Sequence, residues 1–194
     1  MRYLTAIIVL LLLLPPLISA EEFDAEKFIA DGAVMLFGAG CLKYYPTQSE
    51  FEAWIGRNKF DVISSEYTSG LVQEPGGVAY SVNNNGVRYA LVAELGNLCT
   101  VFVKEVNLGK ANEALINLRH GLVKDGVTEN ISSKEKKLSK GVVKTTEYTY
   151  FKDNKWLLTL VVSESTSSQG FFQLAMSAKT QLRANNQVNK DAPR

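Results

Sequence analysis

The segments of this 194-residue chain that have strand character follow one another in two runs, instead of alternating with helices. Between the first two segments, Asn85-Gly86 is a strong signal for a two-residue hairpin turn of type I′. Strands joined by short turns pair in antiparallel order, so the sequence predicts an α+β fold with an antiparallel sheet, or sheets, of about six to seven strands. The predicted strands cover residues 78–83, 87–94, 98–104, 127–133, 142–151 and 155–163, and a last one carries Phe172, Leu174, Met176 and Ala178.

Apolar residues at helical spacing predict about three helices, which we expect to pack on the sheet. The first covers residues 24–41, the second begins at Thr47, and the third covers 108–124 with Asn107 as its N-cap. Thr47 and Glu50 also have the spacing of a capping box. Residues 61–77 have no periodicity and should be mostly loop. The first helix has one stripe of apolar and small residues, namely Phe28, Ile29, Gly32, Ala33, Leu36, Phe37, Gly40 and Cys41.

Two further features of the order of elements bear on the fold. Residues 155–163 are apolar on both strand faces, which is typical of a strand in the interior of a sheet. The sequence of helices, strands, helix and strands also raises the question of an internal repeat, although the two halves share no visible identity.

The first 20 residues have the features of a cleaved secretory signal peptide. Arg2 gives a positive start, residues 4–14 are almost wholly apolar, and Pro15-Pro16 ends that run. An uncleaved membrane anchor is the alternative, but a span needs about 18 or more apolar residues. We therefore expect cleavage near Ala20, a periplasmic or secreted location, a single α+β domain at 21–180 and a flexible polar tail at 181–194.

Cys41 and Cys99 are the two cysteines of the chain. In an exported protein, an even number of cysteines favours a disulfide bond. Cys41 ends the helical stripe, and Cys99 shares a strand face with Val101 and Val103, so a bridge would join helix to sheet. Two free buried thiols are an alternative, whereas redox chemistry normally uses a close pair such as Cys-x-x-Cys.

The charge balance and the histidine count exclude several functions. Lysine and arginine number 21 against 20 acids, a net charge of +1, which gives no indication of a nucleic-acid partner. His120 is the one histidine, and its helical phase relative to Leu118 and Leu122 turns it away from the apolar stripe. It is therefore predicted to face solvent rather than act as a general base.

Other catalytic patterns are also lacking. The sequence contains no Gly-x-Ser-x-Gly elbow, no glycine-rich phosphate loop and no metal-spaced cluster. Acid pairs such as Glu50 with Glu52, or Glu94 with Glu105, have no distinguishing context and are expected to be solvated surface groups. We therefore predict no catalytic residue, no metal ligand and no cofactor, and no membrane insertion after cleavage of the signal peptide.

Several segments resemble a family of small secreted proteins of Gram-negative bacteria. The resemblance is carried by Arg88-Tyr89-Ala90-Leu91-Val92, the turn at Gly96-Asn97, Cys99-Thr100-Val101-Phe102, the helix ending at Cys41, Trp54, and Leu174-Ala175-Met176-Ser177. It extends over most of the mature chain and implies export and a paired set of cysteines. Because that family has no established activity, the resemblance implies no catalytic residues.

Four aromatic residues are the candidates for a binding surface. Tyr44, Tyr45, Trp54 and Tyr67 lie in or near irregular segments, and loops carry function more often than cores do. The alternative is that they cap the core where the helices meet the sheet. We expect a non-enzymatic binding or accessory protein with a protein or small-molecule partner. The alternatives are a hydrolase-type enzyme with an unrecognised site and an envelope-associated structural protein.

Overall fold

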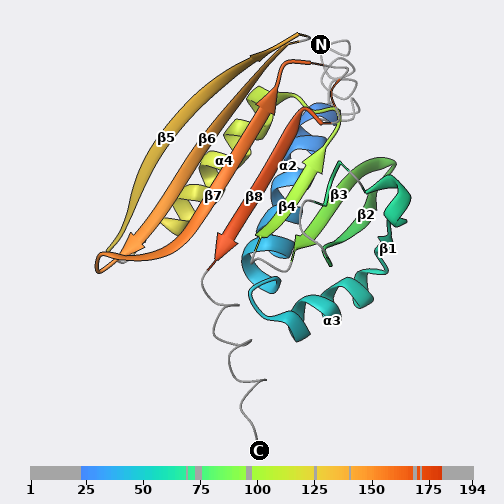
Figure 1. The fold of residues 1–194 in the computed structure, drawn as a ribbon, viewed down its shortest axis with the longest axis horizontal. Helices are drawn as coiled ribbons and strands as arrows, with labels where there is room; N and C mark the ends of the chain where they lie inside the picture. Colours follow the sequence, from blue (N-terminus) through green and yellow to red (C-terminus); the bar gives the residue numbers. More distant parts are fainter. Residues whose placement is uncertain are drawn as a thin grey trace, which may run out of the picture.

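The computed structural model describes residues 23–180 apart from 69, 73–75, 95–97, 125, 140, 168–169 and 171. The predictions on the signal peptide, the Gly96-Asn97 turn and the tail after residue 180 lie outside the described residues. Within them, three α-helices pack on an eight-stranded antiparallel sheet, which confirms the predicted α+β class (Figure 1).

The helices are α2 (Ala25–Phe37), α3 (Gln48–Asn58) and α4 (Leu108–Leu122), with a π-helical segment η1 (Gly38–Tyr44) and a 3-10 turn η2 (Ser65–Tyr67). The strands are β1 (Asp61–Val62), β2 (Val78–Asn84), β3 (Val87–Glu94), β4 (Leu98–Val103), β5 (Val127–Leu138), β6 (Gly141–Lys152), β7 (Lys155–Ser165) and β8 (Leu174–Thr180). Their order across the sheet is β1-β2-β3-β4-β8-β7-β6-β5. The last of the strands described, β8, thus lies in the middle, beside β4.

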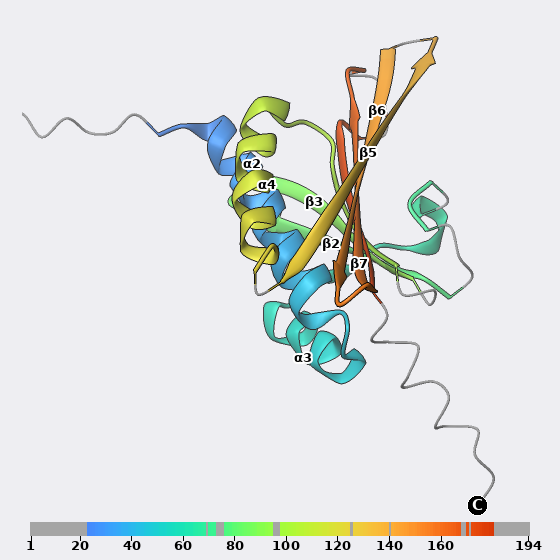
Figure 2. The same ribbon diagram turned by 90° about the vertical axis from the view of Figure 1, so that its left-hand side faces the viewer.

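The three helices cover one face of the sheet, and the main core lies between them and the strands (Figure 2). The inward residues of β4 are Cys99, Val101 and Val103, the face that the alternation predicts, and all three are buried. The predicted stripe of α2 supplies Ala33, Leu36 and Phe37 to the same core, and α4 supplies Ala111 and Leu115.

The predicted turn at Asn85-Gly86 and the turn between β6 and β7 both have the backbone that a type I′ turn requires. Asn85 and Gly86 have φ of 50° and 86°, and Asp153 and Asn154 have φ of 51° and 60°. These turns set the registers of β2 with β3 and of β6 with β7.

The opposite face of the sheet is divided into two parts. Over β2, β3 and β4, the segment at 63–72 forms a small second core in which Leu71, Ala79 and Val92 are buried. Figure 2 shows this segment on the side of the sheet away from the helices. From β4 to β6 this face also carries hydroxyl groups, including the pairs Thr100–Ser177 at 2.9 Å and Thr145–Ser163 at 3.2 Å.

Two local predictions need correction, and a third is confirmed. β5 continues to Leu138 instead of ending at residue 133, because a strand at the edge of a sheet can carry exposed lysines, and these lysines also discourage edge-to-edge pairing. Thr47 is the N-cap of α3 but its side chain makes no capping hydrogen bond, so the predicted capping box is wrong. β7 is an interior strand as predicted, yet Leu157 is 41% exposed because the helices cover one face only.

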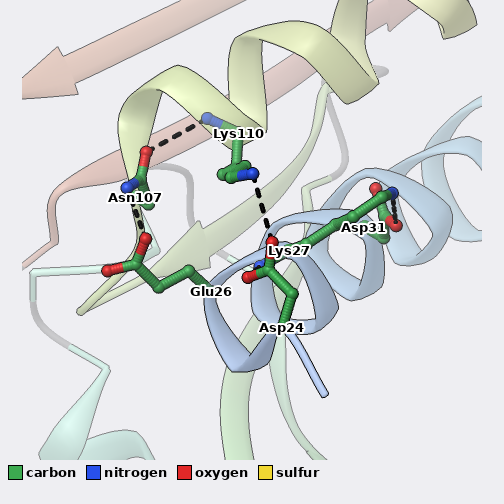
Figure 3. Close-up of polar contacts among 6 residues, drawn as sticks. All are labelled: Asp24, Glu26, Lys27, Asp31, Asn107 and Lys110. Atoms are coloured by element: carbon green, nitrogen blue, oxygen red, sulfur yellow. Dashed lines mark hydrogen bonds and ion pairs between the residues drawn. The ribbon is translucent and has the colours of Figure 1, made fainter. Parts of the chain in front are cut away.

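The N-terminal ends of α2 and α4 lie side by side (Figure 3). Asp24 caps α2 by accepting a hydrogen bond from the backbone N–H of Lys27, and Asn107 caps α4 in the same way through Lys110. The amide of Asn107 also donates to Glu26 at 2.6 Å. The two caps therefore connect the helices to each other as well as ending each one.

The predicted disulfide joins η1 to β4. The Cα atoms of Cys41 and Cys99 are 5.2 Å apart, within the range that a disulfide requires, and both residues are fully buried. The bridge links residues 58 positions apart and attaches the end of the first long helix to a central strand.

Candidate functional site

A hollow with a volume of about 670 Å³ lies between α2, α3 and the β2–β3 hairpin. We call it the α2–α3 groove. Its walls are mainly apolar and aromatic, with a few amides and one carboxylate among them. The lining residues are Phe28, Asp31, Gly32, Met35, Leu36, Ala39, Trp54, Asn58, Phe60, Val82, Asn83, Asn84 and Tyr89.

Trp54 forms one wall of the groove and is held there by its neighbours. Its ring stacks on Tyr44 with centroids 5.3 Å apart and meets the edge of Phe60 at 5.2 Å. Behind it lies Gly40, where an added Cβ would come within 3.1 Å of the indole ring. The ring can occupy this position because Gly40 has no side chain.

Tyr89 closes the floor of the groove. Its hydroxyl donates to the backbone carbonyl of Ile29 in α2 at 3.1 Å, and burial raises its pKa. A Cβ on Gly32 would lie 2.5 Å from the hydroxyl oxygen, so the glycine allows α2 to approach β3 this closely.

The polar groups of the groove are few. Asp31 is the only charged residue in the lining, and its carboxylate pairs with Lys27 one turn earlier on α2. Asn58 donates to the carbonyl of Trp54 at 2.8 Å, and Asn83 accepts from the N–H of Gly86 at 2.9 Å. These bonds fix the two amides at the rim, so the groove offers a prearranged polar edge beside an apolar wall.

The structure brings together three of the four aromatic residues that the sequence proposes as a binding surface. Tyr44 stacks on Trp54, while Tyr45 is fully buried and packs edge-on against Phe51 at 5.5 Å, its hydroxyl donating to the carbonyl of Glu94. Of these three, Trp54 alone lines the groove. Tyr67 is 69% exposed and lies in η2, on the other side of the sheet.

Sequence reasoning missed most of the other groove residues. Phe28, Leu36 and Gly32 were assigned to the apolar stripe of α2 without a binding role. Met35 could have been identified from the sequence, because it is an apolar residue of this helix that lies outside the stripe. It is 72% exposed and lines the groove. Phe60 and Tyr89 come from distant parts of the chain, and no local pattern joins them to α2.

The candidate catalytic groups do not gather into a site. His120 is exposed on α4, as its helical phase predicts, and Glu50 and Glu52 are exposed on α3. Glu94 is 3% exposed, so its expected place among the solvated acids is wrong; it ends β3 where Tyr45 packs against its backbone. Among the described residues, no three acidic, histidine or cysteine side chains are grouped as a metal ion would require.

A second cluster of charges joins α4 to the edge of the sheet. Arg119 forms two hydrogen bonds with Glu129 of β5, at 3.0 and 2.6 Å, and its guanidinium lies 3.8 Å from the centre of the Tyr148 ring. Burial favours the neutral form of Glu129, but the bonds from Arg119 outweigh it and lower the pKa of this carboxyl. The arrangement is a structural clamp, because both charges are already paired.

Comparisons with protein-family models, curated proteins and solved structures found no match. The resemblance to small secreted proteins of Gram-negative bacteria therefore stays a prediction, and the interpretation of the site rests on its geometry. In the part of the chain that is described, no helix is both long enough and apolar enough to span a membrane.

Proposed function

We propose that this is an exported, non-enzymatic binding protein that takes a small amphipathic molecule into the α2–α3 groove. The observation that carries the proposal is the groove itself. Its volume of about 670 Å³ falls within the roughly 300–1,000 Å³ typical of small-molecule sites, which are mostly apolar and have few polar groups.

The lining indicates the chemistry of the ligand. Met35, Trp54 and Phe60 offer an apolar and aromatic wall for a hydrocarbon or ring system. Asp31 is the one charged residue of the lining, and Lys27 already pairs with it, so a neutral polar end is favoured. Amides at the rim can accept from and donate to that polar end.

Export is supported by two observations of different kinds. The first 20 residues have the pattern of a signal peptide, and the disulfide between Cys41 and Cys99 is typical of oxidising compartments. The proposed mature chain begins at Glu21. Intact-mass measurement of the protein recovered from the periplasm tests this, and a product that retains residues 1–20 contradicts it.

Binding can be tested with the neutral dye N-phenyl-1-naphthylamine. Trp156 is replaced by Phe, so that Trp54 becomes the one tryptophan and reports from the groove wall. We expect the dye to quench Trp54 as its own fluorescence rises, in a saturable titration with one site.

The matched variants are Met35→Asp and Leu157→Asp. Both replace an exposed apolar residue with an acid, but Leu157 lies on β7, away from the groove. We expect at least a tenfold rise in the Kd of the dye for Met35→Asp and no change for Leu157→Asp, with circular dichroism confirming the fold. Equal effects of the two variants, or dye binding without quenching of Trp54, would overturn the proposal.

A further inference from the structure

A second hollow, of about 200 Å³, lies on the face of the sheet away from the helices. It is formed between Ile63 and Leu71 on one side and residues of β3 and the end of β4 on the other. The residues that give it its character are Ile63, Leu71, Arg88, Phe102 and Lys104. It opens on the opposite face from the α2–α3 groove, although Tyr89 of β3 borders both hollows, and the inference below does not rest on the function proposed above.

The charges around this hollow are of one sign. Arg88 and Lys104 are its only charged lining residues, and they stand at the same end of β3 and β4, since the neighbouring pair Tyr89 and Val103 are directly opposite in the register. Like charges beside each other on adjacent strands repel. The hollow therefore has a positive rim whose repulsion an anion would relieve.

Among the described residues, no carboxylate forms an ion pair with this rim. Their ion pairs involve Lys27, Lys110 and Arg119, and neither Arg88 nor Lys104 takes part in one. The acids on the neighbouring elements, Asp61 of β1 and Glu66 of η2, do not line the hollow. Arg88 and Lys104 are both exposed, so their charged ends are accessible to a ligand from solvent.

The wall beside the cations is apolar and fixed. Leu71 is buried in the second core, and Phe102 packs against Phe172 with centroids 5.2 Å apart. Ile63 borders the same space, and its backbone N–H bonds to the carbonyl of Ala79 in β2 at 2.8 Å. A ligand can therefore place an apolar group on this wall while its charged group lies between the two cations.

We propose that this hollow binds a small organic anion, a carboxylate or phosphate monoester attached to one ring or a short branched chain. A volume of about 200 Å³ is enough for a group of that size. Arg88 can form paired hydrogen bonds with a carboxylate or phosphate, and Lys104 adds a point charge.

The experiment is an NMR titration of the full mature protein with benzoate, phenyl phosphate, benzamide and acetate. Benzamide has the ring without the charge, and acetate has the charge without the ring. We expect benzoate or phenyl phosphate to shift the backbone amide signals of Ile63, Leu71 and Phe102. The Kd from these shifts should be at least tenfold lower than the Kd of benzamide or of acetate. The tighter of the two anions identifies the head group.

Arg88→Gln and Lys104→Gln should each weaken binding of the tighter anion at least fivefold. Lys152→Gln is the matched control, an exposed lysine beside the turn from β6 to β7, and it should leave the Kd unchanged. Equal weakening by the control, binding of benzamide as tight as benzoate, or binding of acetate as tight as benzoate would each overturn the proposal. Unchanged thermal unfolding of the variants shows that the fold is kept.

Discussion

Lys110, in the first turn of α4, places its Nζ 3.1 Å from the carboxylate of Asp24, the N-cap of α2. Near the other end of α4, Leu118 lies 3.4 Å from where a Cβ on Gly38 would be, just beyond the end of α2. The two helices therefore run parallel, whereas β4 and β8 pair antiparallel at the centre of the sheet. If the two halves were a repeat, a twofold axis perpendicular to the sheet between β4 and β8 would relate α2 to α4. That axis would make the two helices antiparallel. The repeated order of helix and strands is thus not a twofold repeat.

Parallel packing brings two positive helix ends together, and Asp24 offsets them. The N–H of Lys27 and then the side chain of Lys110 lower the pKa of Asp24 below its ordinary 3.8. A lowered folded pKa means that the contribution to stability is present above about pH 4 and is lost as the pH falls through the folded value.

Asp24→Asn should therefore reduce the urea midpoint at pH 7 and have a smaller effect at pH 2.5. Asp61→Asn, at an exposed acid of β1, is the control and should change neither midpoint. A loss from Asp24→Asn that is equal at both pH values would show that the charge is not what stabilises the helix pair.

The contact between Gly32 and Tyr89 predicts a loss of stability on Gly32→Ala, and its size depends on the hydroxyl oxygen of Tyr89. An added Cβ would lie 2.5 Å from the Tyr89 hydroxyl oxygen and 3.2 Å from the ring carbon that carries it. Gly32→Ala should therefore destabilise the protein by about 1–3 kcal/mol, as overpacking does, despite the higher helix propensity of alanine.

In a Tyr89→Phe background the clashing oxygen is absent. Gly32→Ala should then cost at least about 1 kcal/mol less than in the wild type, because the nearest side-chain atom is the ring carbon at 3.2 Å instead of the oxygen at 2.5 Å. Chemical denaturation of the four proteins in this cycle measures the coupling. Additive effects of the two substitutions would contradict the close contact.

The sequence allowed much of the sheet to be predicted because its signals are local. A type I′ turn requires positive φ at two positions, which Asn85 and Gly86 readily adopt. The hairpin can therefore be predicted from these two residues and the strands on either side. The extension of β5 was missed because Lys134–Lys137 read as a solvated run, and edge strands tolerate such residues only when a partner strand is already in place.

The candidate site was much less predictable. Trp54 was identified as a candidate, but its partners Met35, Phe60 and Tyr89 come from α2, a loop and β3. Nothing in the spacing of these residues joins them, since tertiary packing alone makes them neighbours. Tyr45 was placed among the binding candidates because it follows an irregular segment, and the π-helical turn instead directs it into the core.

The clamp between Arg119 and Glu129 should contribute to stability in a way that depends on pH. Both side chains are mostly buried, at 16% and 15% exposed. Glu129→Gln removes the charge that pairs with Arg119 and should cost about 1.5–3 kcal/mol at pH 7, the range for hydrogen bonds to charged groups.

The pKa of Glu129 is lowered from its ordinary 4.5 in the folded protein. Its contribution is therefore present above about pH 4.5 and lost as the pH falls through the folded value, so the difference between wild type and Glu129→Gln should shrink in acid. Glu147→Gln, at an exposed acid of β6, should change stability by less than about 0.5 kcal/mol. A difference that is constant from pH 7 to pH 3 would contradict the ion pair.

The bridge between Cys41 and Cys99 closes a long loop that contains α3 and the first three strands of the sheet. Loop closure lowers the conformational entropy of the unfolded chain, so loss of such a bridge typically costs about 2–5 kcal/mol. We expect that reduction, or Cys41→Ser with Cys99→Ser, lowers the free energy of unfolding by this amount, measured in urea. The sheet should still form, because the bridge joins η1 to β4 and the strands pair through their own backbone bonds. The double-serine variant is the control for the reducing agent. The reductant should destabilise the wild type and leave the stability of this variant unchanged. An equal response of the two proteins would show that the disulfide is not what the reductant acts on.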